Sequence, residues 1–406
     1  MKKHFLASGL LLLLINCYTF SQGSTYAGPY QISSPIVLEN VSNRTISGLE
    51  ISNGKGRCIS LSNCSNITIQ NCKLGPSLGE GVYLCNCRNI TVTNCTMEKI
   101  ATGVVADQAS GIKVTYNDIK NVLGPMPRGQ LVQFGNVSGT GNLIAYNSGE
   151  NIIGQSSPED AISLYMSNGT ATDPIQVVGN WIRGGGPSTS GGGIMAGDMG
   201  GSYILIKDNI LVNPGQYGIT VSSGNDITIT GNKIFGQQLP FNNIGLSAFK
   251  QYNINTYNIT ISNNEVNYTN NNGVLNNMWN AGNCGTVVGW STNKYNPNLT
   301  AAILPATIIG RAKIQSVTTD VNLAQINADF NIYPNQEIKS LIVEVGQLTG
   351  NNKLIVYGLN GQKLVEQSIL NNRTEIDFSK LIAGVYIAKL SGDNSQNVVK
   401  KFIVQK

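Results

Sequence analysis

The chain has 406 residues, of which only 12% are charged, and its formal net charge is +5. The excess positive charge lies towards the two ends, because residues 24–310 carry fourteen Lys and Arg against fourteen Asp and Glu. This neutral central region does not support nucleic-acid binding. The only histidine is His4, so the chain beyond its N-terminus has no imidazole for a catalytic triad, a general base or a metal site.

The first 21 residues have the features of a secretory signal peptide. Lys2 and Lys3 precede an apolar run through Leu10 to Ile15, and we expect cleavage after Ser21. No second apolar segment of about 20 residues follows. The sequence therefore predicts an exported protein without a transmembrane segment.

A short phrase then recurs along the chain at a near-constant step. It reads Asn-Ile-Thr-Ile-Gln-Asn-Cys at residues 66–72 and Asn-Ile-Thr-Val-Thr-Asn-Cys at residues 89–95, and weaker copies continue to Asn264. Apolar and polar residues alternate within each copy, which is typical of a half-buried strand, and a second strand precedes most copies. Strands repeated in this way predict a parallel β-solenoid of about ten coils.

The spacing of the phrase changes along the chain. Its last position falls at Leu49, Cys72, Cys95, Asn117, Asn147, Asn180, Asn209, Asn232 and Asn264, so the step is 23, 23 and 22 residues at first and then 30, 33, 29, 23 and 32. Insertions in a repeat usually form loops on one face, and such loops often carry function. We therefore expect the site at roughly residues 120–256.

The same alignment predicts columns of identical side chains. The Asn column is expected to form an internal stack of amides at a turn, because Asn readily bonds nearby backbone. Cys64 and Cys87 should stack on neighbouring coils about 4.8 Å apart, as should Cys72 and Cys95. Disulfides would fit this distance, and a column of small buried thiols, which we prefer, would fit it equally.

The composition changes from about Ile314, where the phrase ends and short strands separated by turn residues begin. This pattern predicts a small β-sandwich. We expect a signal peptide at residues 1–21, the solenoid at 24–312, a linker at 313–328 and the C-terminal domain at 329–406.

This C-terminal region resembles the sorting domain of the type IX secretion system of Bacteroidota. The matching pieces are Ile332–Asn335, Val356–Gln362, Ile376–Leu381, Gly384–Tyr386 and Lys401–Val404, and one departure is Gln336, where the family more often has Pro. The resemblance implies recognition by the type IX machinery, export across the outer membrane, and then cleavage of the tail or attachment at the cell surface.

The solenoid resembles the right-handed parallel β-helix of pectate lyases, polygalacturonases and related carbohydrate enzymes. The expected fold is thus all-β, a right-handed parallel β-helix followed by the small β-sandwich, and the resemblance implies a polysaccharide partner. Of the polygalacturonase motifs, only Glu159-Asp160 before Ala161 has a counterpart, and a Gly-His-Gly motif cannot exist without histidine. Membership in that particular family is therefore not expected.

Candidate site residues follow from the register of the second strand. Counting four positions beyond Ile194 and Leu246 leads to Asp198 and Lys250, which would share one column two rungs apart at about 10 Å. Arg183 opens a glycine-rich insertion. The predicted substrate-binding residues are an acidic neighbour of Asp160 and four aromatic side chains that offer faces to sugar rings: Glu159, Tyr165, Tyr217, Phe249 and Tyr252.

Three functions fit these residues. The first, slightly preferred, is a polysaccharide lyase that cleaves a uronate-containing polysaccharide by β-elimination, with Lys250 or Arg183 as base and with Ca²⁺ at Asp160 and Asp198 as an optional cofactor. The second is a glycoside hydrolase that uses Asp160 and Asp198 as its carboxyl pair. The third is a non-catalytic polysaccharide-binding or adhesin-type surface protein.

Overall fold

The computed structural model describes residues 29–310 and, with short gaps, residues 330–404. The chain divides into two compact units, Met1–Thr318 and Thr319–Lys406. The expected signal peptide and the whole of the expected linker lie outside the described residues. The described residues form strands and two short 3₁₀ helices, η1 (Trp290–Thr292) and η2 (Ala301–Ile303), and none of these helices is long and apolar enough to cross a membrane.

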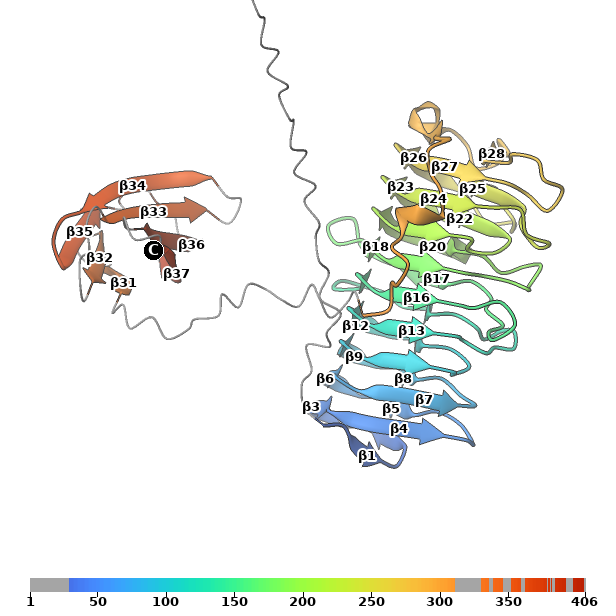
Figure 1. Cartoon of the computed structure of the whole chain (residues 1–406), viewed down its shortest axis with the longest axis horizontal. Helices are drawn as coiled ribbons and strands as arrows, with labels where there is room; N and C mark the ends of the chain where they lie inside the picture. The colour runs from blue at the N-terminus through green and yellow to red at the C-terminus, as the bar shows by residue number, and fades with distance from the viewer. Residues whose placement is uncertain are drawn as a thin grey trace, which may run out of the picture. The chain divides into compact units, whose positions relative to one another are not determined.

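The first unit is a parallel β-helix with three strand ladders (Figure 1). The first ladder contains β1 (Gln31–Ser33), β4 (Leu49–Asn53), β7 (Lys73–Ser77), β10 (Thr96–Glu98), β13 (Asp118–Lys120), β16 (Ser148–Glu150), β19 (Trp181–Arg183), β21 (Ile210–Val212), β24 (Lys233–Gly236), β27 (Glu265–Tyr268) and β30 (Lys294–Tyr295). The second contains β2 (Ile36–Glu39), β5 (Ile59–Ser62), β8 (Val82–Cys85), β11 (Val104–Asp107), β14 (Val132–Gly135), β17 (Ile162–Asn168), β20 (Ile194–Lys207), β22 (Tyr217–Val221), β25 (Ile244–Ala248) and β28 (Met278–Asn280). The third contains β3 (Ser42–Ser47), β6 (Ser65–Gln70), β9 (Arg88–Thr93), β12 (Ser110–Thr115), β15 (Leu143–Ala145), β18 (Ile175–Val178), the second half of β20, β23 (Asn225–Thr230), β26 (Tyr257–Ser262) and β29 (Val287–Val288).

The recurring phrase forms the third ladder, and its copies pair in register. Ile67 of β6 lies beside Ile90 of β9 in a parallel pair, and Ile227 of β23 lies beside Ile259 of β26. Because strand side chains alternate, these residues point inward and are buried in one core that runs the length of the β-helix. The prediction of a parallel β-helix with inward Ile, Val and Leu is confirmed.

The Asn column is an internal amide stack, as expected. The side-chain Nδ2 of each Asn donates to Oδ1 of the next along the series Asn117, Asn147, Asn180, Asn209, Asn232, Asn264 and Asn293. In the shorter first coils Cys72 and Cys95 continue this column as buried thiols. The thiol of Cys95 donates to the carbonyl of Thr93 at 3.3 Å, so the buried-thiol alternative holds and no disulfide is present among the described cysteines.

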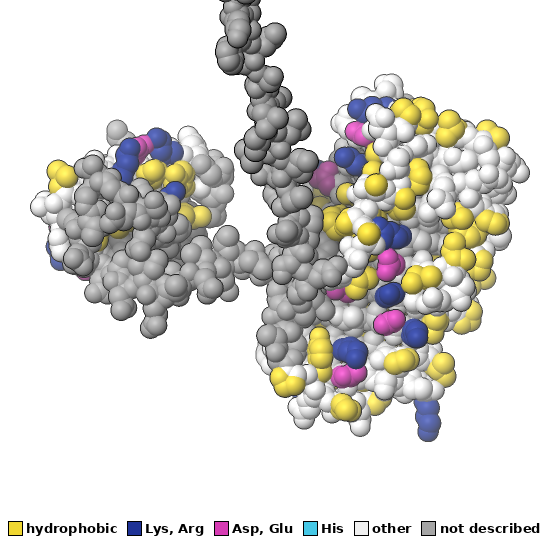
Figure 2. Space-filling model, viewed as in Figure 1, with side chains coloured by type: hydrophobic (Ala, Val, Ile, Leu, Met, Phe, Trp, Pro, Cys, Tyr) yellow, Lys and Arg dark blue, Asp and Glu magenta, His cyan; other side chains and the backbone are white. Residues whose placement is uncertain are grey.

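Ion pairs cross the rungs on the outer face of the first ladder. Figure 2 shows basic and acidic side chains alternating in a stripe over these strands. The pairs are Lys73 with Glu50 at 2.7 Å, Lys120 with Glu150 at 3.9 Å, Arg183 with Glu150 at 3.2 Å and Lys294 with Glu265 at 3.8 Å. Each joins residues that lie opposite one another in register.

The second unit is a β-sandwich of two antiparallel sheets. One sheet contains β31 (Phe330–Asn335), β32 (Ser340–Val345) and β35 (Arg373–Asp377), and the other contains β33 (Asn352–Gly358), β34 (Lys363–Ile369), β36 (Gly384–Ser391) and β37 (Asn397–Val404). Leu341 and Val343 of the first sheet share a buried cluster with Leu354 and Val356 of the second. The alternation of apolar and polar residues in this part of the sequence thus produces two faces that pack on one core.

Candidate active site

The outer face of the second ladder is hollowed by a cavity of about 490 Å³. Its floor contains Gln133 of β14, Ser163 and Tyr165 of β17 and Met195 of β20. Gln133 pairs with Ser163, and Ser163 pairs with Met195, so these residues form one column across three rungs. They point outward because each follows an inward apolar residue on its strand.

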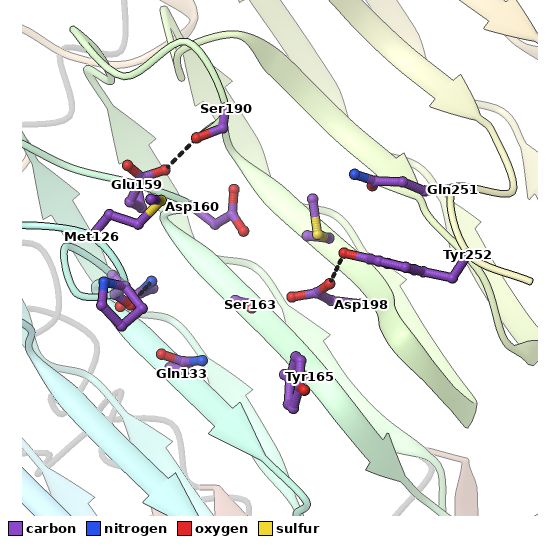
Figure 3. A pocket seen from close by; sticks show the side chains of 13 residues that line it. Met126, Gln133, Glu159, Asp160, Ser163, Tyr165, Ser190, Asp198, Gln251 and Tyr252 are labelled. Carbon is purple, nitrogen blue, oxygen red and sulfur yellow. Dashed lines mark hydrogen bonds between the residues drawn. The ribbon is translucent and has the colours of Figure 1, made fainter.

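The walls of the cavity come from the loops that lengthen these coils. The wall residues are Met126, Pro127 and Gln130 before β14, Glu159 and Asp160 before β17, Asp198 within β20, Ser190 before β20, and Gln251 and Tyr252 after β25. The cavity therefore falls within the region of longer coils, where the spacing of the phrase led us to expect it. Figure 3 shows these side chains converging from several rungs.

Asp160 carries the most perturbed carboxyl group of the cavity. Both the hydroxyl of Tyr217 and the backbone N–H of Gly192, the latter at 3.1 Å, donate to its Oδ1. No described protein group bonds its Oδ2. Burial raises the pKa of Asp160 from 3.8 to about 7, the two hydrogen bonds oppose this shift, and the charges of Asp198 and Glu159 add to it.

Asp198 is the second carboxyl group of the cavity, and it lies one rung further along, opposite Tyr165 in register. The hydroxyl of Tyr252 donates to its Oδ1 at 2.8 Å (Figure 3). Burial raises the pKa of Asp198, and the hydrogen bond from Tyr252 lowers it. The same contact contributes, after burial, to raising the pKa of Tyr252 to about 12. Two carboxyl groups, each with a tyrosine hydroxyl as donor, thus face one cavity.

Glu159 is held at the rim rather than at the floor. Its Oε2 accepts hydrogen bonds from Ser188 at 2.9 Å and from Ser190 at 3.1 Å. Ser190 also lines the cavity, so this contact fixes the loop that precedes β20. Five of the residues singled out in the sequence therefore lie at this cavity: Glu159, Asp160, Tyr165, Asp198 and Tyr252.

Tyr217 and Phe249 line a second cavity of about 350 Å³ further along the same ladder. Tyr217 is buried in the cavity wall, and the burial together with the charge of Asp160 raises its pKa well above 10. Phe249 is exposed and stacks on Trp279 of β28. The two cavities share Ser190, Met195 and Gln251, so they are neighbouring parts of one groove.

Lys250 and Arg183, expected as alternative bases, do not line either cavity. The expected column of Asp198 and Lys250 assumed an unbroken register. In β20, however, two more residues separate Ala196 from Ser202 than separate their partners Val221 and Asn225 on the next rung. Arg183 lies on the first ladder, where it pairs with Glu150 and donates to the carbonyl of Ala306 at 2.8 Å. Neither cation is therefore brought to the carboxyl pair.

The floor residues Gln133, Ser163 and Met195 were not singled out in the sequence. A signal for them exists, because each directly follows the first inward apolar residue of its strand: Val132, Ile162 and Ile194. The same position continues as Thr220, Ser247 and Trp279 in the second cavity. Reading outward positions along the second ladder would have found the whole groove floor.

The carboxyl pair does not fit the Ca²⁺ site that the lyase alternative allowed. Calcium takes six or more oxygen ligands, whereas no three His, Cys, Asp or Glu side chains in the described residues cluster around one point. One oxygen of Asp160 and one of Asp198 already accept tyrosine hydroxyls. No step of the chemistry below is therefore assigned to a metal.

Comparison with known families agrees with this architecture. Residues 34–198 match the family described as right handed beta helix region, and residues 331–405 match the secretion system C-terminal sorting domain. The protein is a right-handed β-helix with a type IX sorting domain. The sorting domain directs the β-helix to the cell surface or the surroundings of the cell. A search of curated protein sequences gave no match.

Several solved structures resemble the β-helix distantly. They include PfbA, a surface adhesin of Streptococcus pneumoniae, at 14% identity and a TM-score of 0.34, covering 58% of this chain and 64% of the adhesin. The tailspike of E. coli bacteriophage HK620 in complex with a pentasaccharide matches at 13% identity and a TM-score of 0.35, covering 62% of this chain and 55% of the tailspike. The catalytic domain of a GH87 α-1,3-glucanase in complex with nigerose matches at 14% identity and a TM-score of 0.36, covering 66% of this chain and 64% of the glucanase structure. The match thus spans less than two thirds of each of these structures.

Proposed function

We propose that the protein is a secreted glycoside hydrolase with Asp160 as general acid and Asp198 as its carboxylate partner. The observation that carries this proposal is the pair itself, because both groups face one cavity from neighbouring rungs and both have a raised pKa. Glycoside hydrolysis needs one carboxyl group that keeps its proton near neutral pH and one that is ionised. A pKa of about 7 suits Asp160 to the first role.

In this mechanism the free Oδ2 of Asp160 protonates the oxygen of the scissile glycosidic bond. The hydrogen bond from Tyr252 favours the ionised form of Asp198. The Asp198 carboxylate then activates a water molecule or attacks the anomeric carbon, and the separation of the two carboxyl groups around bound substrate decides between these routes. Tyr217 and Gly192 hold the Asp160 carboxyl group through Oδ1 and leave the other oxygen to react.

The lyase alternative needs a base beside the α-proton of a uronate and positive charge near its carboxyl group. The two residues expected for these tasks, Lys250 and Arg183, are not at the cavity. The lining residues include no Lys or Arg at all. This composition favours hydrolysis over β-elimination.

The test is an assay of the full chain, after export, against a panel of polysaccharides. New reducing ends without the ultraviolet absorbance of an unsaturated product support hydrolysis, and reducing ends with that absorbance mean a lyase. The absence of both signals would favour the binding-protein alternative. Asp160→Asn and Asp198→Asn should each lower kcat on the order of 10²–10⁴-fold, while Asp226→Asn, whose side chain lies outside both cavities, should leave kcat unchanged.

A further inference from the structure

The groove continues beyond the carboxyl pair. Along its floor, Met195 of β20 pairs with Thr220 of β22, Thr220 with Ser247 of β25, and Ser247 with Trp279 of β28. The floor therefore runs parallel to the axis of the β-helix. With about 4.8 Å between rungs, β28 lies about 14 Å from β20, which is room for several linked sugar units beyond the reacting bond.

The second cavity has the lining that an uncharged sugar requires. Its polar residues carry only hydroxyl and amide groups: Thr189, Ser190, Gln216, Thr220, Asn243, Ser247 and Gln251, besides the phenol of Tyr217. Such groups donate and accept hydrogen bonds, as sugar hydroxyls do. No charged side chain lines it. Polar groups placed beside apolar surface are typical of a ligand site.

An aromatic pair closes the far end of the groove. The rings of Phe249 and Trp279 stack with centroids 5.2 Å apart and 28° between their planes. They stay 38% and 48% exposed, so this apolar surface is not consumed by the core. An aromatic face attracts the positively polarised hydrogens of a partner, and the C–H face of a sugar ring presents such hydrogens.

The charges of the groove decide which polysaccharide it suits. Neither cavity has a Lys or Arg in its lining, and the charged residues present are Glu159, Asp160 and Asp198. A polyuronate would place its carboxylates beside these acids with no opposite charge to compensate them, and like charges at such distances repel. An uncharged chain meets no such penalty.

We infer that the two cavities form one groove for an uncharged polysaccharide lying along the β-helix axis, with Phe249 and Trp279 as a distal sugar-binding subsite. The inference rests on the proposed function for the reaction at the carboxyl pair. The binding that it predicts, however, needs no turnover. It is therefore measured separately from hydrolysis.

The experiment is affinity electrophoresis of the full chain carrying Asp160→Asn, in gels that contain one polysaccharide each. The uncharged probes are dextran, laminarin, galactomannan and soluble starch, and the anionic probes are polygalacturonate and alginate. We expect retardation by at least one uncharged probe and by neither anionic one. Adding Trp279→Ala should weaken that binding about tenfold. The control Tyr257→Ala removes an aromatic ring that is 44% exposed but outside both cavities, and it should change nothing.

Trp279→Tyr keeps an aromatic face and should retain most of the affinity, which separates stacking from a folding defect. Retardation by polygalacturonate or alginate would overturn the inference, as would no retardation by any probe. So would retardation by an uncharged probe that Trp279→Ala leaves unchanged. If the unsubstituted chain binds through Trp279 but releases no reducing ends, the proposed hydrolase fails and the groove inference stands. If it hydrolyses a probe equally well without Trp279, the subsite fails and the hydrolase stands.

Discussion

The hydroxyl group of Tyr217 donates a hydrogen bond to Oδ1 of Asp160 across two rungs of the β-helix. Tyr217 is buried at the start of β22, in the wall of the second cavity, while Asp160 precedes β17 and faces the first. This contact connects the two parts of the groove. It also opposes the effect of burial on the Asp160 carboxyl group, whose pKa is about 7.

Removing that hydrogen bond should shift the pH dependence of catalysis. A donor to a carboxylate favours its ionised form, so Tyr217→Phe should raise the pKa of Asp160 further. Since Asp160 acts with its proton in place, activity should fall as the pH rises through its pKa. The alkaline limb of kcat/KM is thus expected near pH 7 in the unsubstituted chain and at higher pH in Tyr217→Phe. An unmoved alkaline limb would contradict the role of Asp160.

Tyr252→Phe provides the matched control, because Tyr252 bonds the other carboxyl group. The loss of this donor should raise the pKa of Asp198. It should therefore move the acidic limb to higher pH, while the alkaline limb stays in place. The two phenol deletions remove the same group, so the limb that moves identifies which carboxyl group each tyrosine serves.

Asp160 should also make folding stability depend on pH. The folded chain keeps the Asp160 proton up to about pH 7, whereas an unfolded Asp titrates near 3.8. The folded state therefore binds more protons between these values, and stability falls as pH rises through this window. Asp160 contributes its full stabilisation below about pH 3.8 and loses it as the pH passes 7.

Asp160→Asn has no proton to lose, so the difference in thermal stability between it and the unsubstituted chain should change steadily from pH 4 to pH 7 in favour of the variant. Melting temperatures measured across this range provide the test. Two curves that stay parallel would show that Asp160 has an ordinary pKa. That result would also remove the basis for its role as general acid.

The fold could be predicted from the sequence because the same pattern recurs at every rung. A period of two within each copy sets which residues face the core, and the near-constant step sets which copies stack. Asp160 and Asp198 could be predicted because the first directly precedes a second strand, the second follows from the register of that strand, and both lie in lengthened coils. Their pairing with Tyr217 and Tyr252 could not be foreseen, because each contact joins residues more than fifty positions apart.

The expected column of Asp198 and Lys250 is broken because a local feature overrides the repeat. The backbone of Gly197 has a φ of 70°, and a Cβ there would lie 1.8 Å from the carbonyl oxygen of Ser223. This glycine allows the bulge that breaks the column from Asp198 to Lys250. Isolated glycines in a strand are a warning of such bulges, and Gly197, Gly200 and Gly201 all fall within β20.

The position of Arg183 on the first ladder could be predicted from the sequence. Lys120, Glu150 and Arg183 each follow their column Asn by three residues, so they share one register position on the first ladder. Opposite charges at one position of successive rungs predict a ladder of ion pairs rather than a catalytic cation.

The two cations can be separated by substitution. Lys250→Ala should keep full activity and stability, because Lys250 lines neither cavity and makes no ion pair among the described residues. Arg183→Ala should keep kcat but lower the free energy of unfolding by about 1–3 kcal/mol, since it leaves Glu150 and two backbone carbonyls with fewer partners. Assays of kcat and chemical denaturation distinguish these outcomes. Loss of turnover in Lys250→Ala would restore the lyase alternative.

The amide stack should carry much of the stability of the β-helix. Oδ1 of Asn209 accepts from both the backbone N–H and the side-chain Nδ2 of Asn180, each at 2.9 Å, and its own Nδ2 donates to Oδ1 of Asn232 at 3.0 Å. All three residues are buried. Asn209→Ala therefore leaves at least two buried groups without partners, at about 1–3 kcal/mol for each. The expected loss is about 2–5 kcal/mol in the free energy of unfolding, measured by chemical denaturation.

Asn255→Ala is the matched control, because Asn255 is exposed outside the stack and should change stability by less than about 0.5 kcal/mol. Equal effects of the two substitutions would mean that the amide stack is a consequence of the fold rather than a source of its stability.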